Sequence, residues 1–317
     1  MDESIAMTGT CRKRLTGLCA AVFTPFTPDG EVNYDMIPKY VDHLVGQQVE
    51  NVFINGTTGE STLLTVEERK LIAEAWIDSG RGRLKNILIH VGTDNLKDTK
   101  DLADHAESIK ADAISIMPPV YFKPRNIKQL VYFCKEVASA APSLPFFYYH
   151  IPGMTGVELN MEDFLQAAGP EIPTLCGIKY SGKNMMDATQ CLLMDGKKYK
   201  ILFGADEQLL SALAVGMDSA IGTTYNFMPR PFQRMIVALE HCDLDTARKE
   251  QYRAQALINT ALRYGKEAGN VSVFKEIMLM IGLDMGPPRA PMIRLDAATR
   301  KTLQWEVEQT GFFQWIH

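Results

Sequence analysis

Short apolar runs alternate with longer amphipathic segments along most of this chain. From Leu15 onward, runs rich in β-branched and aromatic residues are followed by segments whose apolar positions recur at helical spacing. The short runs predict strands buried on both faces, and the amphipathic segments predict helices. The predicted strands span residues 18–26, 51–56, 86–91, 113–118, 145–151, 174–181, 200–204 and 219–224. This alternation is typical of repeated β-α units with parallel strands.

Capping residues mark where several of the predicted helices begin. Thr65 and Glu68 have the spacing of a capping box. Four other helices each follow an asparagine that can cap them: Asn33, Asn95, Asn126 and Asn160. Eight strands that alternate with eight helices predict an α/β fold in which the strands close into a (β/α)8 TIM barrel.

A doubly wound open sheet is the competing fold. Such a sheet usually has a glycine-rich nucleotide-binding turn after its first strand. Here the segment from Thr24 to Gly30 follows the first strand and contains Pro25 and Pro28 instead. We therefore predict the barrel.

The β-α alternation stops after the eighth helix, near residues 228–242. Three further helical segments follow at 244–264, 273–281 and 297–309, the last of them after the breaker Gly286-Pro287-Pro288. The expected organisation is a polar N-terminal tail over 1–14, a barrel over 15–242 that carries the active site, and a C-terminal helical extension over 243–317.

Composition and charge narrow the classes of partner and the compartment. The 317 residues are 46% hydrophobic and 22% charged, which is ordinary globular composition. A net charge of −5 with scattered Lys and Arg argues against binding to nucleic acid or to an anionic membrane. The six cysteines form no C-x-x-C pair, and neither a signal-like segment nor a long apolar span is found. We expect a cytosolic protein with reduced thiols.

A single lysine interrupts the apolar run of the sixth predicted strand. Lys179 follows Cys176-Gly177-Ile178, all of which read as buried strand. Burial disfavours the charged form of an amine, so a lysine here can act as a nucleophile and form a Schiff base with a carbonyl substrate. The alternative is a strand-end lysine whose ammonium reaches solvent past Tyr180.

Polar residues gather at the ends of the predicted strands. In TIM barrels the catalytic groups lie at the carboxyl ends of the strands, so these residues should meet at one mouth. The set consists of Thr57, Thr58, Tyr121, Tyr149, Ser181, Gly204, Asp206, Glu207, Gly222 and Thr223. The turn from Gly56 to Gly59 can also present backbone N–H groups and two hydroxyls to a carboxylate.

Several of these residues also have a purely structural interpretation. Thr57 and Thr58 fit an ordinary turn between a strand and a helix, and a strand tyrosine such as Tyr149 is often a core aromatic. Asp206 and Glu207 fit the cap of a helix. The residues alone leave both interpretations open.

Two other kinds of chemistry fit the sequence poorly. Residues 177–183 match part of a phosphate-binding loop, but Asn184 stands where the magnesium-binding Ser or Thr belongs. The segment also overlaps a predicted strand, whose amides belong to the sheet. The six histidines lack metal-binding spacing, and His150 should point to the opposite side of its strand from Tyr149. We expect no metal site.

Three motifs give the chain a family resemblance. They are Gly56-Thr57-Thr58-Gly59-Glu60, Tyr149-His150-Ile151-Pro152-Gly153-Met154-Thr155-Gly156 and Gly177-Ile178-Lys179-Tyr180-Ser181. In this order they resemble the pyruvate-dependent class I aldolase superfamily of dihydrodipicolinate synthase and N-acetylneuraminate lyase. The resemblance extends from about Leu15 to the C-terminal helices.

The resemblance implies a Schiff-base mechanism with no metal or organic cofactor. Carried over to this chain, Lys179 is the nucleophile and Tyr149 shuttles a proton while hydrogen-bonded toward Thr57. Thr57 and Thr58 hold the substrate carboxylate. The remaining residues implied to bind substrate are Ser181, Gly204, Asp206, Glu207, Gly222 and Thr223.

Within the superfamily, the chain looks more like the lyase branch. Synthases carry an arginine after the strand-5 tyrosine that holds a second carboxylate, and Met154 takes that position here. In the lyase pattern, Asp206 and Glu207 would meet the glycerol end of a sugar. The implied reaction is reversible cleavage of N-acetylneuraminate to N-acetylmannosamine and pyruvate. Two alternatives stay open: a pyruvate-dependent aldolase for a different sugar acid or aldehyde, and a non-catalytic carbonyl-binding protein.

The resemblance also implies a homotetramer built as a dimer of dimers. In the family, a tyrosine after strand 4 completes the tyrosine–threonine relay of a neighbouring subunit, and Tyr121 matches it in position. The surrounding segment, Pro118 to Phe122, departs most from the family pattern.

Overall fold

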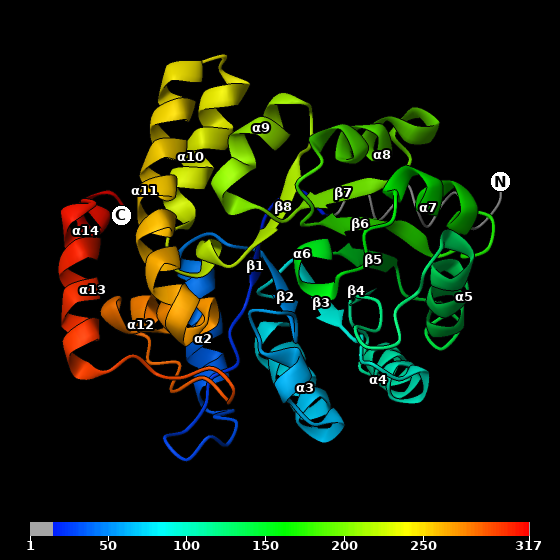
Figure 1. Cartoon of the computed structure of the whole chain (residues 1–317), viewed down its shortest axis with the longest axis horizontal. Coiled ribbons are helices and arrows are strands. Elements are labelled where there is room, and N and C mark those ends of the chain that lie inside the picture. The colour runs from blue at the N-terminus through cyan, green and yellow to red at the C-terminus, as the bar shows by residue number, and fades with distance from the viewer. Residues whose placement is uncertain (1–14, 317) are drawn as a thin grey trace.

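The computed structural model describes residues 15–316. Eight parallel strands pair in chain order, and the eighth pairs with the first, so the sheet closes into a barrel (Figure 1). The strands are β1 (Gly17–Ala21), β2 (Asn51–Ile54), β3 (Asn86–His90), β4 (Ala113–Ile116), β5 (Phe146–His150), β6 (Leu175–Tyr180), β7 (Lys200–Phe203) and β8 (Ser219–Gly222). The predicted TIM barrel is confirmed.

An outer ring of helices surrounds these strands. Each strand is followed by at least one helix before the next strand begins, as the sequence predicts. The main helices are α2 (Met36–Gly46), α3 (Val66–Gly80), α4 (Leu96–Ser108), α5 (Ile127–Ala138), α7 (Met161–Ala168), α8 (Met185–Lys197), α9 (Leu209–Ala214) and α10 (Pro229–Glu240). Four short pieces lie in the β-α loops: η1 (Ser61–Leu63), α6 (Pro152–Thr155), η2 (Asp206–Gln208) and η3 (Thr224–Asn226).

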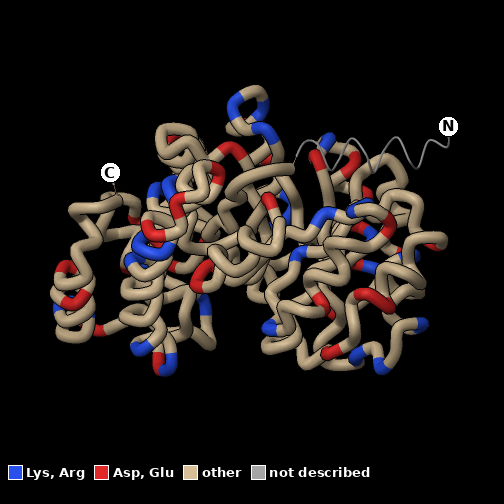
Figure 2. Tube along the Cα trace, turned by 90° about the horizontal axis from the view of Figure 1, so that it is seen from above, with Lys and Arg blue, Asp and Glu red and all other residues tan. Residues whose placement is uncertain are grey.

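The C-terminal part of the chain is helical and lies along one side of the barrel (Figure 1). It comprises α11 (Leu244–Ala268), α12 (Asn270–Met280), α13 (Ala297–Gln309) and α14 (Phe312–Trp315). Helix α11 packs against α10 of the barrel, and both α12 and α13 pack against α11. No helix between residues 15 and 316 is long and apolar enough to cross a membrane. In the view of Figure 2, basic and acidic positions are interspersed along the trace.

Four of the five predicted helix caps are confirmed. Thr65 and Glu68 form the reciprocal hydrogen bonds of a capping box, and three asparagines accept a bond from the backbone N–H three residues later: Asn95, Asn126 and Asn160. The prediction for Asn33 is wrong. Helix α2 begins two residues later than that cap requires, with Asp35 at the N-cap position and no side-chain capping bond. The Asn33 backbone carbonyl instead accepts a bond from the Met36 N–H, which closes a turn before the helix.

The predicted strands were too long at their carboxyl ends. The largest error is in β1, which ends at Ala21, five residues before the predicted end. Proline at position 25 has no N–H to give the ladder, and Phe26 forms an isolated antiparallel bridge with Val32 instead. Buried loop residues at the mouth are apolar like those of a strand, so hydrophobicity alone could not mark the end.

Two groups of buried side chains separate the inside of the barrel from its outer layer. Outward-facing strand residues pack with the helices in one large cluster. Inward-facing residues form a second cluster, which includes Cys19, Ala21, Phe53, Leu88, Phe147, Tyr149, Leu202 and Ile221. At the amino ends of the strands the interior is polar, where Asn86 Nδ2 donates to Asn51 Oδ1 at 2.6 Å. The barrel is therefore a filled core and not a pore.

A β-bulge in β6 decides which way its side chains point. Phe146 pairs with Leu175, but the next residue of β5 pairs with Gly177, so Cys176 is an extra residue in β6. Cys176 faces the barrel interior and Ile178 faces the helices. Leu175 also faces the helices, so strict alternation from Leu175 to Lys179 without a bulge would turn Lys179 outward. The bulge therefore directs the Lys179 side chain toward the inside of the barrel.

Glycine is required at the bulge by close approach of the neighbouring strand. A Cβ on Gly177 would lie 1.9 Å from the Lys200 carbonyl oxygen, which is backbone and cannot move aside like a side chain. Any larger residue would push β6 and β7 apart at the position that orients Lys179.

Candidate active site

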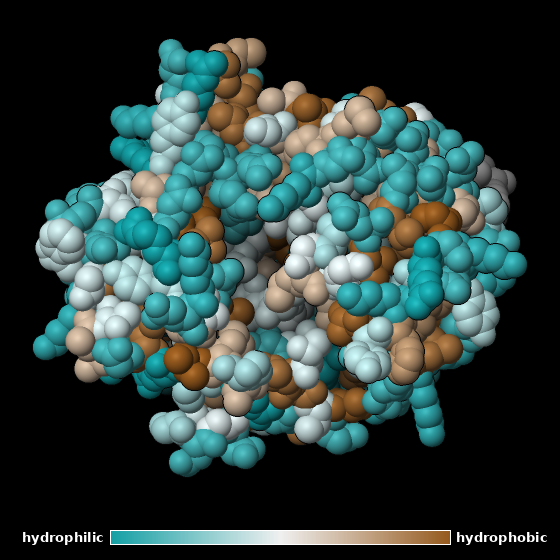
Figure 3. Space-filling model, viewed as in Figure 1, coloured by the Kyte–Doolittle hydropathy of each residue, from teal (hydrophilic) through white to brown (hydrophobic). Residues whose placement is uncertain are grey.

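A pocket of about 540 Å³ opens at the carboxyl ends of the strands. Figure 3 shows a hollow near the centre of the face viewed. All predicted site residues except Tyr121 line the pocket: Thr57, Thr58, Tyr149, Lys179, Ser181, Gly204, Asp206, Glu207, Gly222 and Thr223. The barrel thus brings together residues of β5, β6 and β8 with residues of the loops that follow β2, β6, β7 and β8.

Lys179 is the basic group inside the barrel mouth. The residue is 4% exposed, so the alternative of a solvent-exposed strand-end lysine is wrong. Its Nζ lies 3.8 Å from the centre of the Tyr149 ring and 4.1 Å from that of Phe53. Among residues 15–316, no carboxylate forms an ion pair with it. The amine is held against two aromatic faces and lines the pocket, where it can reach a carbonyl substrate.

Two hydroxyl pairs flank the lysine. Thr57 Oγ1 lies 3.3 Å from the Tyr149 hydroxyl, the contact that the resemblance implies. Thr58 Oγ1 lies 2.6 Å from Thr223 Oγ1 and so links the loops after β2 and β8. These groups can donate or accept, as a substrate with a carboxylate and a chain of hydroxyls requires.

Asp206 is a buried carboxyl at the side of the pocket. Its Oδ2 accepts bonds from the Thr224 backbone N–H at 2.9 Å and from the Thr224 hydroxyl at 2.6 Å. Burial raises the pKa of this carboxyl to about 6, although the bonds from Thr224 act in the opposite direction. Glu207 is half-buried and also lines the pocket. Asp206 therefore holds the loop after β8 and does not cap its own short helix.

Space beside Asp206 is available only because residue 222 is glycine. A Cβ on Gly222 would lie 1.8 Å from Asp206 Oδ1. A side chain there would expel the carboxylate from its place between β7 and β8. The predicted binding residue Gly222 thus acts by leaving room for an acid.

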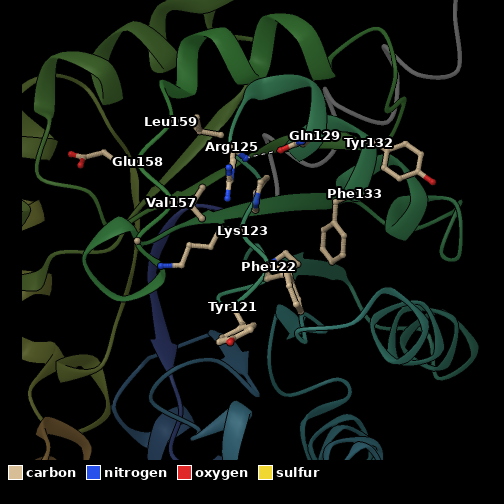
Figure 4. Close-up of a pocket in the computed structure, with 13 residues that line it drawn as sticks. Tyr121, Phe122, Lys123, Arg125, Gln129, Tyr132, Phe133, Val157, Glu158 and Leu159 are labelled. Atoms are coloured by element: carbon tan, nitrogen blue, oxygen red, sulfur yellow. Dashed lines mark hydrogen bonds between the residues drawn. The ribbon is translucent and has the colours of Figure 1, made fainter.

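Tyr121 lies outside the pocket that contains Lys179. It is 81% exposed, and its ring meets that of Phe122 edge to face at 5.0 Å. Figure 4 shows both rings beside a groove that passes Lys123 and Arg125. Within one subunit, Tyr121 does not join the Tyr149–Thr57 pair.

The two histidines near the site have structural surroundings. His150 points away from Tyr149, as predicted, and its ring packs on Tyr180 at 4.9 Å. His90 lies inside the barrel and meets the rings of Tyr149 and Phe53 edge to face. Burial lowers the pKa of His90 well below its ordinary value, so it is neutral at physiological pH. Between residues 15 and 316, no group of three or more His, Cys, Asp or Glu is placed to hold a metal ion.

Asn184, which replaces the magnesium-binding residue of a phosphate loop, has a structural role instead. Its side chain accepts a bond from the Asp187 backbone N–H and caps α8. The amides of the preceding segment belong to the sheet or its extension, since Ser181 N–H donates to the His150 carbonyl. The interpretation against a nucleotide site agrees with this geometry.

Sequence reasoning missed the part that the C-terminal helices play in the site. Gln251 and Gln255 of α11 donate to the backbone carbonyls of Asp206 and Glu207. The pocket wall also includes residues from α11, α12 and the segment after it: Ile258, Leu262, Asn270, Val271, Phe274 and Met292. Two glutamines one helical turn apart were the available signal, but their target could not be read from the sequence.

Comparison with known proteins agrees with this geometry. Residues 14–310 match the model of the dihydrodipicolinate synthetase family. The chain belongs to this family. Among curated members, N-acetylneuraminate lyase of Mus musculus is 44% identical over 284 residues, which cover 89% of this chain and 88% of the relative.

Solved structures of other family members have the same fold. Proteus mirabilis N-acetylneuraminate lyase superimposes with a TM-score of 0.90 at 37% identity, covering 94% of this chain and 99% of that one. A catalytic lysine mutant of Ruminococcus gnavus sialic acid aldolase superimposes with a TM-score of 0.88 at 26% identity, covering 94% and 96% of the two chains. The family member described here therefore shares its whole architecture with sialic acid aldolases.

The raised pKa of Asp206 gives a prediction for stability. In the unfolded chain the carboxyl ionises near its ordinary value of 3.8, whereas in the fold it ionises at about 6. The contribution of Asp206 to the free energy of unfolding is therefore fully favourable below pH 4, and it is lost as the pH rises toward 6. Each pKa unit corresponds to about 1.4 kcal/mol, so the loss is about 3 kcal/mol. Asp206→Asn should gain stability relative to wild type by about this amount between pH 4 and 7, as measured by urea unfolding.

Asp243→Asn is the matched control. Asp243 caps α11 at the surface, and hydrogen bonds from Thr246 lower its pKa. The stability difference for this variant should change with pH in the opposite direction. A pH-independent difference for Asp206→Asn would contradict the buried, proton-binding state of Asp206.

Proposed function

We propose that the protein is a Schiff-base aldolase that reversibly cleaves N-acetylneuraminate to N-acetylmannosamine and pyruvate. The observation that carries the proposal is the buried Lys179 amine, which faces Tyr149 and Phe53 beside a Tyr149–Thr57 hydroxyl contact. The names of the most similar relatives support the choice of substrate.

In the proposed mechanism, Thr57, Thr58 and their backbone N–H groups hold the carboxylate of the open-chain sugar acid. The free amine of Lys179 attacks the C2 ketone, and the hydroxyl of the resulting carbinolamine takes the Tyr149 phenol proton and leaves as water, which gives an iminium. The Tyr149 phenolate then accepts the proton of the C4 hydroxyl as the C3–C4 bond breaks, and the electron pair of that bond moves into the iminium to form an enamine. N-acetylmannosamine leaves as the aldehyde. Protonation of the enamine at C3 and hydrolysis release pyruvate and regenerate the lysine.

The acids after β7 are proposed to bind the polyol end of the sugar. Asp206 and Glu207 both line the pocket, as do Thr57 and Thr58. In the sequence the two acids follow Lys179, whereas the Thr57-Thr58 turn precedes it. Carboxylates accept hydrogen bonds from hydroxyls, and an acid paired with a hydroxyl binds more strongly than a neutral acceptor. Ser181, Gly204, Gly222 and Thr223 complete the proposed substrate surface.

The runner-up is a pyruvate-dependent aldolase that acts on a different sugar acid or aldehyde. Met154, which lines the pocket, offers no charge to a second substrate carboxylate, and this favours a lyase over a synthase. A non-catalytic carbonyl-binding protein is disfavoured, because binding alone does not require a hydroxyl relay next to the amine.

A homotetramer with shared sites is part of the proposal. Tyr121, Phe122 and Tyr132 are between 64% and 85% exposed and border a groove of about 780 Å³ (Figure 4). Exposed aromatic rings that gather in one place are typical of a protein interface. We propose that a second copy covers this groove and that Tyr121 of each subunit completes the relay of the other.

Two further features belong to the proposal. The protein acts in the cytosol, which cell fractionation would test; Cys19, Cys134, Cys191 and Cys242 form no disulfide, as is usual in a reducing compartment. Cys11 lies outside the described residues. The barrel unit runs from 15 to 242 and the helical unit from 243 to 317, a division supported by the order of elements, since only helices follow α10 in the described residues; the predicted tail at 1–14 also lies outside the described residues.

Incubation with N-acetylneuraminate tests the function. Wild type should release pyruvate and N-acetylmannosamine in equal amounts. Lys179→Arg should lose cleavage by on the order of 10³-fold or more, because a guanidinium stays protonated and cannot form the imine.

Glu207→Gln should lose about 10- to 100-fold in cleavage but retain deuterium exchange of the pyruvate methyl group, which needs only the enamine.

The same assay separates the alternatives. Faster cleavage of another sugar acid would favour the runner-up, and no cleavage of any sugar acid would contradict the function. If Glu207→Gln lost methyl exchange and cleavage equally, its role would be structural.

Mixing of subunits tests the shared site. Lys179→Ala subunits lack the amine but keep Tyr121, whereas Tyr121→Ala subunits keep the amine. If the tyrosine acts in a neighbouring site, co-refolding the two variants creates heterodimers with one complete site, and activity should rise above that of either parent. Phe122→Ala is the matched control, since it removes an adjacent exposed ring and should stay active by itself. Activity at the weighted mean of the parents, despite proven subunit exchange, would reject the shared site.

A further inference from the structure

A buried ion pair joins the Gly56–Glu60 turn to helix α12. The Lys275 Nζ lies 2.6 Å from Glu60 Oε1, and the two side chains are 2% and 0% exposed. Lys275 belongs to the C-terminal helices, whereas Glu60 ends the turn that carries Thr57 and Thr58. The pair therefore connects the turn that is proposed to bind the substrate carboxylate to a helix that is distant in the sequence.

Both carboxylate oxygens of Glu60 are held. The backbone N–H of Arg289 donates to Oε2 at 2.8 Å, while Lys275 occupies Oε1. The Lys275 ammonium also donates to the Pro287 carbonyl at 3.2 Å. The Lys275 and Arg289 cations lie 4.3 and 4.6 Å from the centre of the Phe26 ring. This packing leaves Glu60 no freedom to turn away.

Arg289 anchors the same segment to the barrel. Its guanidinium forms a two-fold ion pair with Glu68 of α3 and donates to the carbonyls of Gly30 at 2.9 Å and Leu63 at 3.0 Å. The Arg289 backbone, whose N–H binds Glu60, is thus fixed to the loops after β1 and β2.

A contribution to the stability of the fold does not explain well why the Lys275–Glu60 pair is buried. Burial lowers the pKa of Lys275 to about 8, even though the Glu60 carboxylate acts to raise it. The desolvation of two charges offsets most of their attraction, and an apolar pair of similar volume is often as stable. A role in fixing the position of the turn accounts better for a buried charge pair at this place.

The turn itself depends on where Glu60 is held. Glu60 has a left-handed backbone with φ of 60°, which is unfavourable for a residue with a side chain. Its N–H donates to the Thr57 carbonyl at 3.0 Å, so a shift of Glu60 moves the threonine next to Tyr149. The other side of the turn is fixed by Thr24, whose hydroxyl donates to the Gly59 carbonyl at 2.7 Å.

Helix α12 touches the pocket as well as the turn. Asn270, Val271 and Phe274 line the pocket, and Phe274 is the neighbour of Lys275 on the same helix. One helix therefore contacts the wall of the pocket and fixes the turn that is proposed to hold the substrate carboxylate.

We propose that Lys275 is a positioning residue: through Glu60 it holds the Thr57-Thr58 turn in the geometry that binds the carboxylate of the substrate. The inference rests on the proposed function and adds the C-terminal helix α12 to the machinery of that site. Lys275 touches no reacting atom, and its effect passes entirely through Glu60.

The test compares two ketones that differ only in the carboxylate. Pyruvate carries the charge, and methyl pyruvate does not. Borohydride traps the imine of either one, and the trapped fraction is measured by mass spectrometry against ketone concentration. In Lys275→Met and in Glu60→Gln, the half-saturating concentration of pyruvate should rise about 10-fold or more, the loss expected when charge-assisted hydrogen bonds are misplaced. That of methyl pyruvate should change by less than about twofold.

A double variant and a control separate position from stability. Lys275→Met/Glu60→Gln removes both charges, so it should recover much of the unfolding free energy lost in the single variants while the pyruvate defect persists. Glu276→Gln is the matched control, because Glu276 is a buried acid on the same helix that pairs with Arg294 at 3.1 Å instead of the turn. This control should bind both ketones like wild type.

Three outcomes would overturn the inference. The first is a folded variant with unchanged pyruvate trapping, and the second is an equal loss for the two ketones. The third is a pyruvate defect that disappears in the double variant together with the stability loss. If the single variants fail to fold, the double variant provides the same comparison. If the wild-type protein formed no trapped imine with either ketone, the proposed function would be rejected, and with it the proposal that the turn binds the substrate carboxylate.

Discussion

The orientation of one strand residue controls what the rest of this barrel can do. Lys179 points into the mouth because an extra residue at Cys176 reverses the alternation of β6. The bulge is possible because Gly177 lets the backbone of β7 approach more closely than a side chain would permit. An amine turned outward at this position would lie among the helices, and the mouth would lack the proposed nucleophile.

The C-terminal helices contribute to the site and are more than an attachment to the barrel. Helix α11 holds the loop after β7 by two glutamine side chains, and α12 lines the pocket and pairs with the turn after β2. The strands of the barrel carry Lys179 and Tyr149, while the helices hold the loops that carry other candidate site residues.

Much of the fold and site could be predicted because the signals are local. Each β-α unit has its own hydrophobic pattern, so the barrel followed from eight repeats of it, and a capping box such as Thr65 with Glu68 lies within one turn of helix. That candidate residues such as Thr57 and Asp206 line one pocket could be expected, because the carboxyl ends of parallel strands share one edge of the sheet.

What could not be predicted depends on contacts between distant segments. The bulge is set by how β5 and β6 pair, and neither strand shows it alone. Lys275 reads as an ordinary helix lysine until Glu60 is seen beside it. Asn33 was a plausible cap, but the loop that precedes α2 closes a turn first. Exposed Tyr121 shows how a residue expected in a site can lie outside it within a single subunit.

The identity of the reactive amine is the central claim, and peptide mapping after borohydride reduction in the presence of pyruvate tests it most directly. Lys179 and Lys183 both line the pocket, but only Lys179 is buried against the aromatic rings. The account predicts one pyruvyl group, on Lys179. A label on Lys183 or any other lysine, or no label while N-acetylneuraminate is cleaved, would contradict it.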